Sequence, residues 1–71
     1  MNEIKLQLRE EYIKLGQALK AAGLVSSGVE AKIVIQDGEV SVNGETDERR
    51  GRKLYAGDIV RYGDAIIQIE E

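Results

Sequence analysis

Two helical patterns follow each other closely in the first half of the chain, and each carries its own end signals. The first has apolar residues at helical spacing, at Leu15, Ala18, Leu19 and Ala22. Gly23 comes next and suits the left-handed position that ends many helices. In the second pattern Glu30 stands three residues after Ser27, which predicts a capping box in which each side chain accepts a backbone N–H of the other residue. The chain must therefore fold around a helix–break–helix unit.

The rest of the chain has the alternation of strands. Strands are predicted at residues 3–9 and 40–42, and two further strands, at residues 58–62 and 65–69, are predicted to form a hairpin. We expect the second helix to bury Ala31, Val34 and Ile35 and to end at Asp37-Gly38. Asn43-Gly44 and Gly63-Asp64 are typical of tight turns between antiparallel strands.

These elements define an α+β fold in which two packed helices lie against a small, mainly antiparallel, twisted sheet. Pairing of the first strand with the last would bring the two termini together. The polar segment from Glu45 to Lys53, which we call the Arg-rich loop, is expected to form a loop or an irregular edge strand. Leu54 and Tyr55 are expected to return to the core after it. With 71 residues the chain is expected to form a single domain over residues 1–71.

Composition excludes several classes of function. The sequence has no Cys and no His, so thiolate or imidazole metal sites and Cys- or His-based catalysis are excluded. Carboxylates are plentiful, but a chain this short with few aromatic residues offers little material for a catalytic pocket. We therefore expect no enzyme activity, no cofactor, no metal and no small-molecule substrate. No apolar run reaches the roughly 18–20 residues of a membrane span, so we expect a cytoplasmic protein. We also expect a monomer.

Charge is unevenly distributed along the chain. The formal net charge is −3, which by itself argues against nucleic acid as a partner. However, the only charged residues between Tyr12 and Val29 are lysines, and a dense basic cluster follows later, at Arg49, Arg50, Arg52 and Lys53. Asp47 and Glu48 stand next to these arginines and are expected to be their solvated partners. A surface with one basic face remains compatible with the net charge.

A family resemblance rests on several motifs in order. The segment LKAAGLVSSGVEAKIVIQDGEVSVNG, followed by Gly57-Asp58-Ile59-Val60, resembles the RNA-binding domain named after ribosomal small-subunit protein S-four, also called the alpha-L motif. Within that superfamily the chain resembles the small stand-alone YaaA/YbcJ type. The resemblance implies that the helix pair contacts RNA. It also shows a departure, because many members have Arg after the paired serines, where this chain has Gly28.

The resemblance and the charges together give a candidate RNA-binding surface. Its expected members lie on the two helices, at their connection, in the Asn-Gly turn and in the Arg-rich loop: Lys14, Gln17, Lys20, Ser26, Ser27, Gly28, Lys32, Asn43, Gly44, Arg49, Arg50, Arg52 and Lys53. We expect them to bind structured RNA through phosphate contacts, with ribosomal RNA as one candidate.

The same residues allow other interpretations. The lysines could be ordinary solvated surface, Ser27 could serve only as a cap, and the tyrosines could either pack or stack on bases. The alternative function is a protein-interaction module that kept the fold but has weak or no affinity for RNA.

Overall fold

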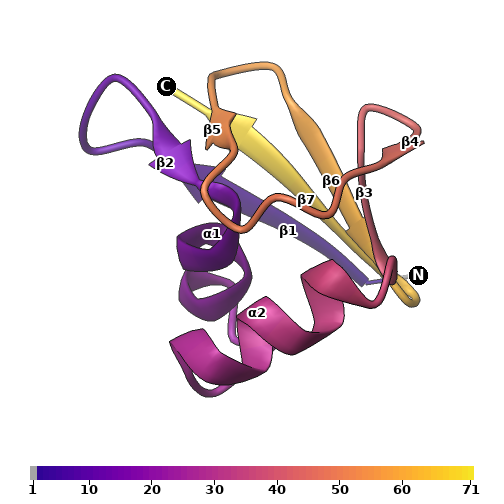
Figure 1. Ribbon diagram of the computed structural model, residues 1–71. Coiled ribbons are helices and arrows are strands. Elements are labelled where there is room, and N and C mark those ends of the chain that lie inside the picture. Colours follow the sequence, from indigo (N-terminus) through magenta and orange to yellow (C-terminus); the bar gives the residue numbers. More distant parts are fainter. Residues whose placement is uncertain (1) are drawn as a thin grey trace.

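The computed structural model describes residues 2–71 and contains two helices and a mainly antiparallel sheet (Figure 1). The elements are, in chain order, β1 (Asn2–Gln7), β2 (Ile13–Lys14), α1 (Leu15–Ala21), α2 (Gly28–Gln36), β3 (Val40–Val42), β4 (Glu45–Thr46), β5 (Lys53–Leu54), β6 (Ile59–Tyr62) and β7 (Ala65–Glu70). The predicted α+β class is confirmed.

The strands form a five-stranded sheet and a separate two-stranded ribbon. The sheet has the order β1-β7-β6-β3-β4, and the ribbon pairs β2 with β5. All pairings are antiparallel except that of β1 with β7. The predicted contact between the first and last strands is therefore present, but the expectation that it brings the termini together is wrong. In this parallel pair Asn2 lies beside Ala65, and Gln7 lies beside Glu70. The start of the chain therefore lies at one end of the β1–β7 pair and the end of the chain at the other (Figure 1).

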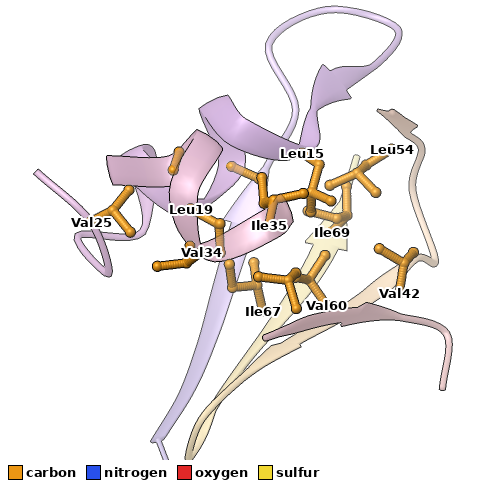
Figure 2. Packing of buried hydrophobic residues seen from close by; sticks show 13 residues of the cluster. Leu15, Leu19, Val25, Val34, Ile35, Val42, Leu54, Val60, Ile67 and Ile69 are labelled. Carbon is orange, nitrogen blue, oxygen red and sulfur yellow. The ribbon is translucent and has the colours of Figure 1, made fainter. Parts of the chain in front are cut away.

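The core lies between the helices and one face of the sheet. Figure 2 shows Leu15 and Leu19 from α1 and Ile35 from α2 pointing toward Ile67 and Ile69 of β7. Every second residue of the inner strands is buried, so the alternating residues form an outer face that is turned away from the helices. The charged residues Lys5 and Arg61 are exposed and belong to this outer face. Burial of the inner face supplies the main force that holds the helices on the sheet.

Both helices end as their glycines predict. Gly23 and Gly38 have φ angles of +75° and +78°. At each end two backbone N–H groups beyond the helix donate to carbonyls of its last turn, in the Schellman arrangement. The Asn43-Gly44 turn also matches its prediction, because both residues have positive φ and Val42 pairs directly with Glu45.

Within residues 2–71 no helix combines the length and the apolar character that a membrane crossing requires.

Candidate nucleic-acid interface

The ribbon formed by β2 and β5 brings together two lysines that are far apart in the sequence. Lys14 pairs directly with Lys53, and Ile13 pairs with Leu54. Leu54 is fully buried, whereas both lysines are exposed. Because side chains alternate along a strand, the ribbon has one apolar face toward the core and one cationic face toward solvent.

The Arg-rich loop is attached to the beginning of α1. The first backbone N–H groups of an α-helix have no partner inside the helix. Here the N–H of Leu15 donates to the carbonyl of Arg52 over 2.8 Å, and the N–H of Gly16 donates to the carbonyl of Arg50 over 3.0 Å. Figure 1 shows the chain between β4 and β5 running past the start of α1. The basic cluster therefore lies beside Lys14.

Gly16 allows this close approach. A Cβ atom at this position would lie 2.7 Å from Cγ of Arg50, which is shorter than the non-bonded contacts that Cβ atoms make in proteins. Gly16 itself is buried. Residue 16 must therefore lack a side chain for Arg50 to lie against the helix.

Asp47 organises the same loop from inside. The earlier expectation of a solvated carboxylate is wrong, because Asp47 is only 6% exposed. Its Oδ2 atom accepts hydrogen bonds of 2.8 Å from Nη2 of Arg49 and from Nη1 of Arg52, and Oδ1 accepts from the backbone N–H and Nε of Arg49. These donors, with the Arg49 side chain first, hold the pKa of Asp47 far below its ordinary value, and the carboxylate in turn raises the pKa of Arg49.

The ion pairs of Asp47 with Arg49 and Arg52 reduce the net charge of the basic cluster. One carboxylate and two guanidinium groups leave a single net positive charge on Asp47, Arg49 and Arg52 together. Within residues 2–71, Arg50 and Lys53 have no carboxylate within ion-pair distance. The cluster therefore consists of two cations fixed on Asp47 and two that are free to meet a ligand.

Helix α1 continues the cationic surface. The backbone N–H of Lys14 donates to Oε1 of Gln17 over 3.4 Å, so Gln17 helps to close the start of the helix. Gln17 and Lys20 are exposed and border a shallow groove between α1 and the end of β1. The groove is lined by Leu6, Gln7, Leu8, Arg9, Glu10, Tyr12, Ile13, Gln17, Lys20 and Ala21.

The start of α2 differs from the predicted capping box. Ser27 Oγ accepts the N–H of Glu30 over 3.2 Å, as predicted. The carboxylate of Glu30 instead reaches Ser26 and accepts from its backbone N–H over 2.7 Å and from its hydroxyl over 3.0 Å. These hydrogen bonds from Ser26 lower the pKa of Glu30, so the helix start already holds an anion. Ser26 therefore has its donors engaged within the chain, while Gly28 faces open space and Lys32 is exposed farther along the helix.

Asn43 has an internal role. Its Nδ2 atom donates to Oδ1 of Asp58 over 3.0 Å, and its Oδ1 atom accepts the N–H of Ile59 over 2.9 Å. These contacts join the β3–β4 turn to the start of β6. Gly44 has a φ angle of +88° and is exposed at the same turn. The structure thus explains both residues by the turn itself.

Sequence reasoning missed the aromatic pair beside the ribbon. The rings of Tyr12 and Tyr55 lie 6.0 Å apart, and Nζ of Lys53 lies 4.7 Å from the center of the Tyr12 ring. Tyr55 is 43% exposed, so the expectation that it returns to the core with Leu54 is wrong. The sequence held one signal for this pairing, because Tyr-Ile-Lys at residues 12–14 and Lys-Leu-Tyr at residues 53–55 have the same pattern in opposite order. Strands of two residues are, however, too short to show a periodicity.

The sequence and the fold agree with a known family. A family model described as the S4 domain matches residues 6–70, and the chain belongs to this family. Its relatives include a probable ribosome maturation protein, RlbA, from Bacillus subtilis, which is 51% identical over 55 residues and 78% of both chains. The putative RNA-binding protein YbcJ from Escherichia coli is 33% identical over 61 residues, covering 86% of this chain and 87% of YbcJ.

The structural comparison agrees with the assignment to the family. The solution structure of YbcJ from Escherichia coli, described as revealing an alpha-L motif involved in RNA binding, superimposes with a TM-score of 0.75 at 30% identity. The match covers 100% of this chain and 91% of the YbcJ chain.

Proposed function

We infer that the protein binds structured RNA without acting as an enzyme, through a basic face formed by the two helices and the Arg-rich loop. Membership of the S4 domain family and the described RNA-binding motif of YbcJ support RNA as the partner. The similarity to a probable ribosome maturation protein supports ribosomal RNA as the class of RNA.

One observation carries the proposal. Lys14 lies far from Arg50 and Lys53 in the sequence, but the three residues meet at the start of α1, through the β2–β5 pairing and the hydrogen bond from Gly16 to Arg50. Several cations on one face are what a phosphate backbone requires, because each contact releases condensed counterions. This arrangement gives a protein with a net charge of −3 a local cationic surface.

The outer face of the sheet provides the contrast. Its exposed cations are Lys5 and Arg61, and they share this face with Glu3, whose carboxylate accepts a hydrogen bond from Gln68. A phosphate backbone would meet acidic as well as basic side chains there. RNA is therefore expected on the helix side of the molecule.

A second function, binding of a protein partner, is favoured by a specific surface feature. Val29 and Ile33 are 69% and 53% exposed and stand four residues apart on α2, so they lie together on the solvent side of that helix. Two adjacent exposed apolar side chains are more typical of protein contacts than of phosphate contacts.

Crosslinking in cells followed by sequencing of the attached RNA tests the proposal. The wild-type protein should recover ribosomal RNA, and a Lys14→Gln/Arg50→Gln/Lys53→Gln variant should recover much less. A Lys5→Gln/Arg61→Gln variant, which removes the two exposed cations of the outer face, is the control and should behave as wild type. Equal recovery by all three proteins would contradict the proposed face, and recovery of no RNA by the wild type would favour the protein-binding function.

A further inference from the structure

The outward face of the β2–β5 ribbon has an unusual composition. Lys14 and Lys53 lie opposite each other on it, and Tyr12 and Tyr55 stand next to them at the same end. We call these four residues the Tyr–Lys face. Cations combined with exposed aromatic rings are the side chains that proteins use to hold unpaired nucleotides.

Within the described part of the chain the paired lysines have no carboxylate partner, although Nζ of Lys53 lies over the Tyr12 ring. Like charges directly opposite each other in an antiparallel pair are destabilising. Within residues 2–71, every ion pair is made by Asp47, so neither Lys14 nor Lys53 is neutralised by a carboxylate. An anion bound between the two ammonium groups would remove this repulsion.

Tyr55 is exposed although its backbone is firmly held. Its N–H donates to Oδ2 of Asp58 over 2.8 Å, and its carbonyl accepts the N–H of Asp58 over 3.0 Å. The preceding residue, Leu54, is fully buried. The ring is therefore presented to solvent from a fixed position, which lowers the entropy lost when a ligand stacks on it.

We propose that the Tyr–Lys face binds one unpaired nucleotide of the RNA, with its base stacked on Tyr55 and its phosphate between Lys14 and Lys53. The proposal rests on the proposed function of RNA binding and adds a site within it. In a continuous helix each base is covered by its neighbours, so an aromatic ring reaches only a base that has left the stack. The nucleotide is thus one in a bulge or at the end of a helix.

The test uses two RNA hairpins, one fully paired and one identical except for a single bulged adenosine. The wild-type protein should bind the bulged hairpin about tenfold more tightly, the factor typical of one stacked base. Tyr55→Ala should lose this preference and keep its affinity for the paired hairpin, while Tyr55→Phe should retain the preference. Ile59→Ala, which shortens an exposed apolar side chain on the outer face of the sheet, should behave as wild type.

A fluorescence measurement provides an independent readout. The chain contains no Trp, so a Tyr55→Trp variant has a single indole. The bulged hairpin should quench its fluorescence strongly, and the paired hairpin should not.

Four outcomes would overturn the proposal. Equal affinity of the wild type for both hairpins, or a preference that survives in Tyr55→Ala, would mean that no base stacks on Tyr55 while RNA binding itself stands. Competition by a polyglutamate peptide as strong as that by the bulged hairpin would assign the Tyr–Lys face to an acidic protein. Failure of the wild type to bind either hairpin would contradict the proposed function as well.

Discussion

Asp47 and Arg52 form an ion pair of 2.8 Å that closes the Arg-rich loop on itself. The carboxylate is almost fully buried, and the same oxygen also accepts from Arg49. A second attachment, from the N–H of Asp47 to the carbonyl of Val40 over 3.0 Å, joins the loop to β3. The loop that carries the basic cluster is therefore shaped by one acidic residue at its center.

The first prediction concerns this residue. Asp47→Asn should lower the free energy of unfolding by about 2 kcal/mol, because the variant loses the charge that strengthens the hydrogen bonds from Arg49 and Arg52. Chemical denaturation at neutral pH measures the difference. Glu48→Gln, a change at the exposed neighbouring position, is the control and should leave stability nearly unchanged. Equal stability of Asp47→Asn and Glu48→Gln would show that the loop does not depend on the ion pair.

The second prediction is a pH dependence. The pKa of Asp47 is lower in the folded protein than in the unfolded chain, so its stabilisation is present above the ordinary pKa of an aspartate, about 3.9, and is lost as the pH falls toward the folded-state value. The free energy of unfolding should decrease below about pH 4. Asp47→Asn should show a smaller decrease over the same range. Parallel pH profiles of the two proteins would rule out this assignment.

The third prediction concerns Gly16. Gly16→Ala should displace Arg50, because the added Cβ atom meets its side chain at 2.7 Å. Overpacking costs about 1–3 kcal/mol, partly offset by the better helix propensity of Ala. RNA affinity should fall in a binding titration.

Gly51 is the matched control for this change. It belongs to the same loop, and a Cβ atom there meets no other atom within 4 Å. Gly51→Ala should therefore keep both affinity and stability. If Gly16→Ala bound RNA as well as Gly51→Ala does, the position of Arg50 would be irrelevant to binding.

Local signals in the sequence were sufficient for much of the fold. Gly23, Gly38 and the Asn43-Gly44 turn were predicted correctly because their backbone conformations depend on the residue itself and its neighbours. The parallel direction of β1 relative to β7 was not predicted, because it depends on the path of the whole chain. The ribbon was missed because β2 and β5 have two residues each.

The candidate site was predicted as a set of residues but not as an arrangement. Charge spacing identified the basic cluster, yet it could not show that Asp47 is buried and engages two of the four cations. That burial follows from the contact of Asp47 with β3. Likewise, the reach of Glu30 back to Ser26 depends on the backbone before the helix and not on residue spacing.

The salt dependence of RNA binding reports how many phosphates the protein contacts, because each contact contributes about 0.7–0.9 to the slope of log affinity against log salt. Lys14→Gln/Arg50→Gln/Lys53→Gln should reduce the slope of the wild type by roughly two to three, whereas Lys5→Gln/Arg61→Gln should leave it unchanged. A slope shared by all three proteins would contradict the claim that these cations form one phosphate-binding face.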